Sequence, residues 1–279
     1  MSDSWLWHRL HDRIGSLVED YAGVAGVCVK DLNSGQRIAV RGDEEFPTAS
    51  TIKIHVLTRL LIRVEKGELD LDQMIHLTPQ QFVPGSGIIT YLEGPLSFSL
   101  LDIAILMIVL SDNTATNLCI DLAGIDETNA MLRELGMKQT TLRRKMQDMA
   151  AVARNHENIA TPAECVDMLE LLYQGKPSTF VSERCLSILK KPKNGSLNKA
   201  LPATIPLANK PGGMERVRCD AGVVYLPRRP YAIAVMTKFG LAEPLALERI
   251  IIDVARLVHE TMVALDTSSD YGQGIPNQV

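Results

Sequence analysis

The sequence predicts an α+β fold, an α/β sandwich with an all-α subdomain, in which both ends of the chain form one antiparallel sheet. Two observations lead to this prediction. Stretches rich in β-branched residues lie near both ends of the 279-residue chain, whereas apolar residues between them recur at helical spacing. We therefore expect residues 1–45 and 200–266 to form the sheet domain, and residues 46–199 to form an inserted all-helical domain.

The N-terminal part of the chain is predicted to form a helix followed by a β-hairpin. Residues 1–21 mix charged and apolar side chains in a helix-like pattern. Residues 24–29 and 36–40 are rich in valine and flank the sequence DLNSG, whose Asn, Ser and Gly favour a tight turn. These two segments therefore predict a pair of strands.

Helical spacing dominates from residue 50 to about residue 190. In the first predicted helix, apolar residues recur every three or four positions until Gly67 ends the run: Ile54, Leu57, Leu60, Leu61 and Val64. Further helices are predicted at residues 100–110, 114–122, 127–135, 162–173 and 178–189.

Strand patterns return in the C-terminal part of the chain. Residues 205–210, 218–225 and 231–238 combine β-branched and aromatic residues with flanking turns rich in Gly and Pro. A long helix is predicted over residues 245–265. Residues 267–279 lack periodicity, so we expect a disordered tail there.

Composition and charge exclude several classes of protein. The chain has 29 Lys and Arg against 33 Asp and Glu, a net charge of −4 without a block of like charges, so we expect no nucleic-acid partner. The longest apolar run, residues 103–110, is far shorter than the roughly 20 residues that cross a bilayer, so we expect no membrane association. The first residues do not resemble a secretory signal, which predicts a cytoplasmic protein, or a periplasmic or secreted one if a leader was removed. We expect a monomer.

The cysteines and histidines do not predict disulfide or metal chemistry. The five cysteines are widely scattered and none is spaced as CxxC, which predicts reduced, buried thiols. The six histidines show no HExxH or other metal-ligand spacing, and the sequence contains no Gly-rich phosphate-binding motif. We therefore expect no metal and no cofactor.

The first candidate motif is Ser50-Thr51-Ile52-Lys53, at the start of a predicted helix. The helix start provides an exposed backbone N–H and the positive end of the helix dipole beside the Ser50 hydroxyl. Lys53 lies one turn further on, where a neutral amine could accept the serine proton. The two residues can be a nucleophile and its base, or Ser50 can be a plain helix cap.

The second candidate motif, Ser111-Asp112-Asn113, falls between two predicted helices. A polar triplet in a short corner exposes a hydroxyl and a carboxamide. Ser111 could pass a proton to a leaving nitrogen, and Asn113 could bind a substrate amide. The alternative is that these residues only cap the following helix.

The third candidate motif is Lys210-Pro211-Gly212-Gly213, which we expect at the end of a strand over residues 205–209. An edge strand without side chains at Gly212 and Gly213 lets a substrate backbone approach closely. The Gly213 and Ser50 N–H groups could then form a two-donor oxyanion hole. The alternative is a turn that simply ends the strand.

Together, Ser-x-x-Lys, Ser-Asp-Asn about 60 residues later and Lys-x-Gly about 100 residues after that resemble the active-site signature of the penicillin-recognising serine enzymes. The class A serine β-lactamases are the most similar family, and Pro84-Gly85-Ser86-Gly87 and residues 101–117 also resemble their helical domain. The resemblance covers nearly the whole chain and implies a β-lactamase/transpeptidase-like fold. It implies these roles: Ser50 as nucleophile, Lys53 as its base, Ser111 and Asn113 facing the substrate, and Lys210 acting electrostatically.

One departure from that family concerns hydrolysis of the acyl-enzyme. Class A enzymes carry a glutamate, in a Glu-x-x-Leu-Asn pattern, that activates the hydrolytic water, and the corresponding residues 142–150 lack this pattern. Loss of a general base slows its step by about 10²- to 10⁴-fold, so we expect a slowly hydrolysed acyl-enzyme. Asp148 is the candidate replacement base and Glu157 the alternative. Either carboxylate could instead hold the loop by pairing with an arginine, namely Arg143, Arg144 or Arg154.

A second departure is Pro211, which stands where the family usually has a hydroxyl residue that helps to bind the substrate carboxylate. Arg216 or Arg218 could supply a guanidinium for that carboxylate, and we prefer Arg218 because it opens the β-rich run. The alternative for both arginines is a solvated charge at the end of a strand.

The resemblance implies a serine hydrolase that opens a β-lactam amide through a Ser50 acyl-enzyme. Two alternatives use the same fold: a D-Ala-D-Ala peptidase or esterase, and a covalent β-lactam-binding sensor. The expected partner is thus a small-molecule β-lactam, or a peptide or ester substrate.

Overall fold

The computed structural model describes residues 2–241, 243–269 and 271–275. The chain divides into two compact units. The first unit comprises Met1–Thr51, Ala160–Glu170 and Asn194–Val279 and contains the large sheet. The second unit comprises Ile52–Ile159 and Leu171–Lys193 and is mainly helical.

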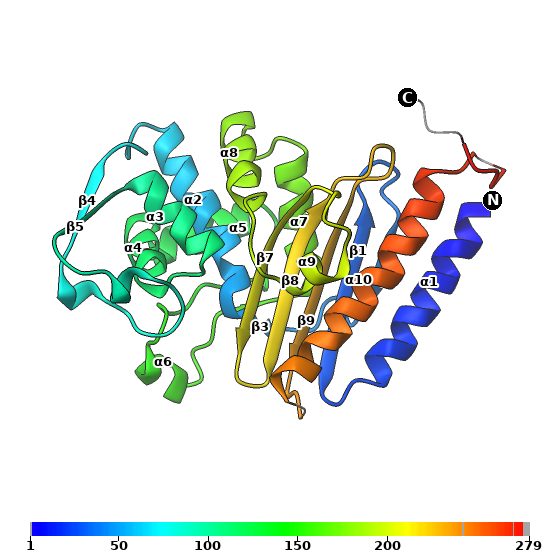
Figure 1. The fold of residues 1–279 in the computed structure, drawn as a ribbon, viewed down its shortest axis with the longest axis horizontal. Coiled ribbons are helices and arrows are strands. Elements are labelled where there is room, and N and C mark those ends of the chain that lie inside the picture. Colours follow the sequence, from blue (N-terminus) through cyan, green and yellow to red (C-terminus); the bar gives the residue numbers. More distant parts are fainter. Residues whose placement is uncertain (1, 242, 270, 276–279) are drawn as a thin grey trace. The chain divides into compact units, whose positions relative to one another are not determined.

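The first unit is built on a five-stranded antiparallel sheet with the strand order β2-β1-β9-β8-β7 (Figure 1). The strands, from the N- and C-terminal parts of the chain, are β1 (Val24–Asp31), β2 (Arg37–Val40), β7 (Leu207–Met214), β8 (Val217–Val224) and β9 (Tyr231–Lys238). Val27 of β1 pairs with Val235 of β9, which joins the two ends of the chain in one sheet. The predicted sheet built from both termini is therefore confirmed.

Helices α1 (Ser2–Glu19) and α10 (Pro244–Asp266) lie side by side in this unit (Figure 1), and the short helix α9 (Ser196–Ala200) packs against α10. Their apolar faces and the sheet form one core, with fully buried residues from each layer: Ile14, Val27, Val235, Ile251 and Val258. Burying a side chain of this size contributes about 1.5–3 kcal/mol. The contact between helices and sheet is thus the main apolar contribution to this unit.

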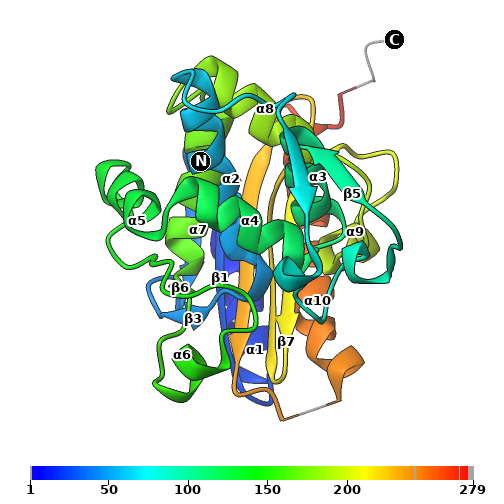
Figure 2. The same ribbon diagram turned by 90° about the vertical axis from the view of Figure 1, so that its left-hand side faces the viewer.

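In the second unit, helix α2 (Lys53–Glu65) packs against its helical neighbours (Figure 2): α3 (Leu100–Val109), α4 (Asn113–Ala123), α5 (Ile125–Glu134) and α8 (Thr179–Leu189). The predicted apolar face of α2 is buried, since Leu57, Leu60 and Leu61 are all 0% exposed. Helix α7 (Pro162–Tyr173), whose residues up to Glu170 belong to the first unit, has its predicted bounds. The helices predicted from spacing are therefore present.

The structure also contains elements that the sequence analysis did not predict. Strands β4 (Met74–Leu77) and β5 (Leu96–Ser99) form an antiparallel hairpin in the second unit, a part of the chain for which spacing predicts helices alone. Further short elements are β3 (Phe46–Pro47), β6 (Ile159–Ala160), helix α6 (Met149–Ala153) and the 3₁₀ turns η1 (Ala49–Ile52), η2 (Pro79–Gln81) and η3 (Ile89–Tyr91). Segments of two to five residues are too short to show a period.

The prediction that the strand leading into the third motif ends at residue 209 or 210 is wrong. Strand β7 continues through Pro211 and Gly212 to Met214, and Gly213 pairs with Arg218 of β8. Because β7 is an edge strand, Pro211 can lack a backbone N–H without leaving a second neighbouring strand unpaired.

The predicted disordered tail, residues 267–279, includes residue 270 and residues 276–279, which lie outside the described residues. Among the others, Ser268 and Gly274 form an isolated antiparallel bridge, and the Ile275 N–H donates to the Thr267 carbonyl at 2.7 Å.

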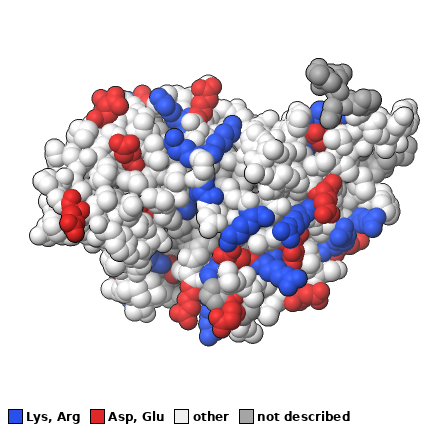
Figure 3. Space-filling view, viewed as in Figure 1, with Lys and Arg blue, Asp and Glu red and all other residues white. Residues whose placement is uncertain are grey.

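The surface charges are mixed. On the face shown in Figure 3, Lys and Arg side chains lie among Asp and Glu side chains, in line with the small net charge of −4. Within the described ranges, no helix has both the length and the hydropathy that crossing a membrane requires.

A buried carboxylate, Asp31, connects two turns at one end of the sheet. Its Oδ1 accepts the N–H groups of Asn33 and Ser34 at 2.9 and 3.0 Å, and its Oδ2 accepts from Arg229 Nη1 at 2.9 Å. Burial by itself would raise the pKa of Asp31, but the hydrogen bonds from Ser34, Arg229 and Asn33 outweigh burial and hold the pKa below its ordinary value. The ionised carboxylate therefore stabilises the fold above the unfolded-state pKa of about 3.9, and this contribution is lost as the pH falls through the lower folded-state pKa.

Replacing Asp31 by Asn should lower the free energy of unfolding at pH 7 by roughly 3 kcal/mol, because it removes the buried partner of the Arg229 guanidinium. The difference from the unmodified protein should shrink below about pH 4, where the Asp31 carboxylate of the unfolded chain takes up a proton, and further as the pH falls through the lower folded-state pKa. Urea unfolding at pH 7 and pH 3 measures both effects. Asp253→Asn removes the exposed ion pair with Arg249 and should cost less than about 0.5 kcal/mol. Equal losses in the two variants would contradict the prediction.

Candidate active site

Ser50 belongs to the first unit and lies on the 3₁₀ turn η1, which leads directly into α2. The Thr51 N–H and hydroxyl both donate to the Thr48 carbonyl, at 3.0 and 2.7 Å, and fix this turn. Ala49 has a φ of 43°, a left-handed conformation that costs a non-glycine residue about 1 kcal/mol or more. The N-cap of α2 is Ile52, so Ser50 does not occupy the capping position of that helix.

Strand β7 passes close to this turn. A Cβ atom at Gly212 would lie 2.8 Å from the Ser50 nitrogen, closer than real Cβ atoms approach, and 3.0 Å from the Thr48 carbonyl oxygen, which is also a tight contact. A residue without a side chain is therefore required at Gly212. The Cα of Gly213 lies beside the Arg218 side chain, since a Cβ atom at Gly213 would lie 3.4 Å from the Arg218 Cδ.

Lys210 is buried in the same unit, with 1% of its surface exposed. The strand that carries it is held by its neighbour Asn209, whose Nδ2 donates to Asp220 at 2.9 Å and to Asn198 at 3.0 Å. Because Asp220 and Asn198 lie on β8 and α9, these bonds attach the edge strand to two other elements. Lys210 thus sits on a fixed part of β7.

The two candidate arginines occupy different positions. Arg216 is exposed in the turn between β7 and β8, with a φ of 60°. Arg218 is half-buried, and its Nη1 donates to the carbonyls of Met214 and Val217, both at 2.7 Å. Its side chain lies beside Gly213. The structure therefore places Arg218 against the glycine stretch of β7.

In the second unit, Lys53 and Ser111 are in direct contact. Lys53 begins α2, is 0% exposed, and donates from Nζ to the Ser111 hydroxyl at 2.9 Å and to the Ser111 carbonyl at 2.8 Å. Ser111 lies between α3 and α4 with a φ of 54°, which lets both of its oxygens accept from the same amine. An amine next to a serine hydroxyl at this distance can exchange a proton with it.

Asp112 and Asn113 attach this corner to the loop over residues 84–89. Asp112 caps α4, because its Oδ1 accepts the Ala115 N–H at 2.9 Å, and its Oδ2 accepts the N–H groups of residues 88 and 89. Asn113 Nδ2 donates to the Pro84 carbonyl at 2.8 Å. Capping, one of the two predicted alternatives for this motif, is therefore the role of Asp112.

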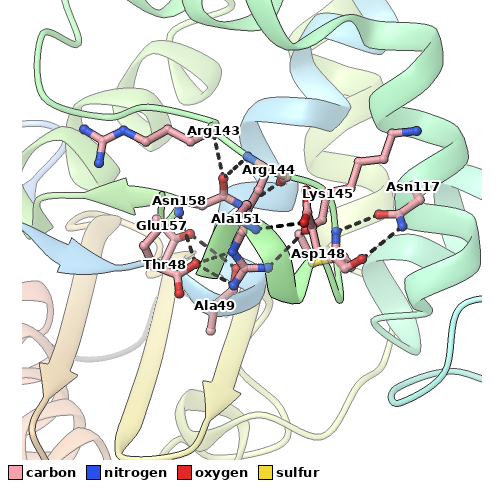
Figure 4. Close-up of polar contacts among 11 residues, drawn as sticks. Thr48, Ala49, Asn117, Arg143, Arg144, Lys145, Asp148, Ala151, Glu157 and Asn158 are labelled. Atoms are coloured by element: carbon pink, nitrogen blue, oxygen red, sulfur yellow. Dashed lines mark hydrogen bonds and ion pairs between the residues drawn. The ribbon is translucent and has the colours of Figure 1, made fainter. Parts of the chain in front are cut away.

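The loop over residues 143–158 is held by contacts with its own backbone (Figure 4). Asn158 accepts the N–H groups of Arg143 and Arg144 and donates to the Arg144 carbonyl. The Arg144 Nε also donates to Glu157 at 2.6 Å, and both side chains are largely buried. Glu157 therefore pairs with an arginine of this loop, as one of the two alternatives for this carboxylate predicts.

Two further residues shape the same loop (Figure 4). Asp148 caps α6, because its Oδ1 accepts the Ala151 N–H at 2.9 Å. Asn117 accepts the Met146 N–H at 2.7 Å and donates to the Met146 carbonyl at 3.1 Å. The sequence analysis assigned no role to Asn117, although it follows Asn113 by four residues on α4 and so lies on the same helix face. No motif or helical spacing in the sequence points to Asn158 in the same way.

Comparison with known proteins identifies the family of this chain. A sequence model described as the β-lactamase enzyme family matches residues 9–262. The chain belongs to the β-lactamase enzyme family. The resemblance predicted from the motifs at Ser50, Ser111 and Lys210 is therefore confirmed.

Relatives of this β-lactamase family member match over most of its length. β-Lactamase ROB-1 of Haemophilus influenzae is 27% identical over 256 residues, which are 89% of this chain and 83% of that protein. The structure of a β-lactamase from Sphaerobacter thermophilus is 31% identical, with a TM-score of 0.85 over 91% of this chain and 97% of that chain. An ancestral class A β-lactamase is 29% identical, with a TM-score of 0.83 over 90% of this chain and 99% of that one. A mutant of PBP-A, solved as an acyl-enzyme complex with penicillin G, is 30% identical, with a TM-score of 0.83 over 92% of this chain and 97% of that chain. The chain is thus a class A β-lactamase-like serine hydrolase with the β-lactamase/transpeptidase fold.

The thiols of this family member are buried and are not reactive nucleophiles at neutral pH. All five cysteines are free and buried, as the sequence predicts. Burial raises the pKa of Cys119 to about 12, against the opposing charge of Lys53, and burial also raises the pKa values of Cys185 and Cys219 to about 12. The thiolate is the reactive form, so these cysteines are inert at neutral pH. In the part of the chain that the structure describes, no group of three or more His, Cys, Asp or Glu side chains could hold a metal ion.

A thiol reagent such as DTNB should therefore react with the native protein at pH 7 more than about 10²-fold more slowly than with the unfolded chain. All five thiols should react once guanidinium unfolds the protein. Release of the coloured thiolate from the reagent measures both rates. Rapid labelling of one or more cysteines in the native protein would show that burial does not protect them.

Proposed function

We propose that this enzyme opens β-lactam amides through an acyl-enzyme on Ser50, and that this acyl-enzyme is hydrolysed slowly. The observation that carries the proposal is the buried Lys53 amine, which lies 2.9 Å from the Ser111 hydroxyl and three residues after Ser50 along the turn that leads into α2. The relatives of this chain also support the proposal. ROB-1 and the Sphaerobacter thermophilus protein are β-lactamases, and the PBP-A mutant was solved as an acyl-enzyme complex with penicillin G.

Acylation needs one nucleophile and one route for a proton. The Ser50 Oγ attacks the β-lactam carbonyl carbon while the neutral Lys53 amine takes the hydroxyl proton. Ser111 gives its own proton to the β-lactam nitrogen as the C–N bond breaks, and it regains one from Lys53. The N–H groups of Ser50 and Gly213 stabilise the oxyanion of the tetrahedral intermediate. The ring opens and leaves an ester on Ser50.

Three side chains bind the substrate in this proposal. Asn113, 7% exposed, binds a substrate amide with its carboxamide. Lys210 contributes a positive charge. Arg218 pairs with the substrate carboxylate from its position beside Gly213, where Pro211 cannot supply a hydroxyl.

Deacylation uses Asp148. Glu157, the other candidate, is engaged with Arg144 in a largely buried ion pair. A water molecule attacks the ester carbonyl and gives one proton to Asp148. As the bond to the Ser50 oxygen breaks, Asp148 passes this proton on to that oxygen, which restores both the serine and the carboxylate. The same Asp148 carboxylate also caps α6, and an acceptor shared between two tasks is the reason that we expect slow hydrolysis.

Substituting Ser50 or Lys53 tests acylation. Ser50→Ala should abolish the mass increase that a penicillin produces in the intact protein. Lys53→Ala should retain the adduct but form it about 10²- to 10⁴-fold more slowly, as expected for loss of a general base. Lys66→Ala, at the exposed end of α2, should acylate at the unmodified rate. An adduct in Ser50→Ala that forms as fast as in the unmodified protein would defeat the proposal.

Substituting Asp148 tests deacylation. Asp148→Asn should lengthen the lifetime of the acyl adduct by about 10²- to 10⁴-fold, and Asn keeps an oxygen that can cap α6. Mass spectra recorded after a short exposure to penicillin give the lifetime. Asp121→Asn, which removes the exposed ion pair with Lys145, should leave the lifetime unchanged. The same lifetime in Asp148→Asn and the unmodified protein would show that another group activates the water.

The same measurements separate the alternative functions. Faster acylation by D-Ala-D-Ala peptides or simple esters than by penicillins would favour a peptidase or esterase. Complete labelling by a β-lactam without any release would favour a covalent sensor.

A further inference from the structure

We infer that Gln147 is a specificity-determining residue, which selects substrates that carry an acylamino side chain. The inference rests on the proposed function and concerns residues of the second unit alone. Gln147 precedes Asp148 in the loop over residues 143–158, and the sequence analysis gave it no role. Its carboxamide lies next to that of Asn113.

Gly85 shows how closely the two carboxamides approach each other. A Cβ atom built on Gly85 would lie 2.8 Å from Asn113 Nδ2 and 2.9 Å from Gln147 Nε2. Both amide nitrogens therefore converge on one point beside the Gly85 backbone. A side chain at Gly85 would collide with both, and its φ of 100° also favours glycine.

Both carboxamides retain hydrogen-bonding groups for a ligand. Asn113 uses Nδ2 to bond the Pro84 carbonyl, and no residue in the described ranges donates to its Oδ1. The Gln147 side chain is exposed and makes no hydrogen bond with the residues that the structure describes. A carboxamide has two N–H donors and one carbonyl acceptor, so each side chain can bond a substrate.

The loop holds the Gln147 carboxamide in position. The residue before it, Met146, is bound through its N–H and its carbonyl by Asn117 (Figure 4), and the residue after it, Asp148, caps α6. Gln147 itself has a φ of 60°, a left-handed conformation that only a well-supported backbone maintains. A recognition group that is already positioned loses less conformational entropy on binding.

Two adjacent carboxamides match the chemistry of a secondary amide. The N–H groups of Asn113 and Gln147 can donate to its carbonyl oxygen, and Asn113 Oδ1 can accept its N–H. A substrate with an ammonium group at this position would face N–H donors and lose these bonds. Gln147 therefore favours an acylated nitrogen over a free amine on the β-lactam ring.

The test compares two penicillins that differ at this nitrogen: penicillin G, in which it is acylated, and 6-aminopenicillanic acid, in which it is free. Gln147→Gly removes the carboxamide. Glycine adopts a φ of 60° without strain, so the backbone of the loop should be unchanged. The kcat/KM for acylation of Ser50 by penicillin G should fall roughly 3- to 10-fold, the loss expected for one neutral hydrogen bond, with no change for the free amine. Gln147→Asn keeps a carboxamide and should lose less. Met149→Ala, which alters an exposed side chain of the same loop, should change neither rate.

An equal fall for both penicillins, or no fall for penicillin G, would overturn the role of Gln147 while leaving the Ser50 acyl-enzyme in place. Failure of the unmodified protein to form an adduct with either penicillin would instead overturn the proposed function, and this inference with it.

Discussion

The contact between the buried Lys53 amine and Ser111 is the interaction on which the proposed acylation depends. An amine with 0% exposure has lost its water and must find acceptors inside the protein. Ser111 supplies two, its carbonyl and its hydroxyl, and its backbone has a φ of 54°. The corner between α3 and α4 therefore stores strain of about 1–3 kcal/mol in order to place a hydroxyl on a lysine.

A strained backbone conformation persists only where neighbouring contacts hold it in place. Asp112 makes such contacts beside Ser111, since its carboxylate caps α4 and also accepts two N–H groups of the loop over residues 84–89. In the first unit, Ala49 is held at a φ of 43° by the Thr48–Thr51 bonds directly before Ser50. Ala49 and Ser111 are two of the seven non-glycine residues with positive φ in the described part of the chain, and each lies at or directly before a proposed reactive hydroxyl.

Two kinds of feature could be predicted from the sequence: helices and strands whose apolar residues repeat at a regular spacing, and motifs whose residues are adjacent in the chain. Helix α7 and strand β9 have their predicted bounds because their apolar residues repeat over 12 and eight positions. The extension of β7 through Pro211 was missed, because tolerance of proline there follows from the edge position, which only the strand order defines. The motifs at Ser50 and Ser111 could be found because their residues are contiguous, whereas Asn158 acts on backbone groups 14 and 15 residues away and no local pattern records it.

The contact to which we assign the proposed acylation is made by side chains, whereas the contacts that shape the loop over residues 143–158 are made to the main chain. Lys53 and Ser111 bond through their own side chains, so replacing either removes the contact itself. Asn117 and Asn158 instead hold main-chain atoms of the loop, at Met146 and at residues 143–144, and leave the side chains there unconstrained by these bonds. The loop can therefore change the residues it presents while its backbone path is retained. A retained backbone path is thus compatible with a change of side chain. The absence of a Glu-x-x-Leu-Asn pattern from residues 142–150 is such a difference, and the proposal of a long-lived acyl-enzyme rests on it as well as on the second task of Asp148.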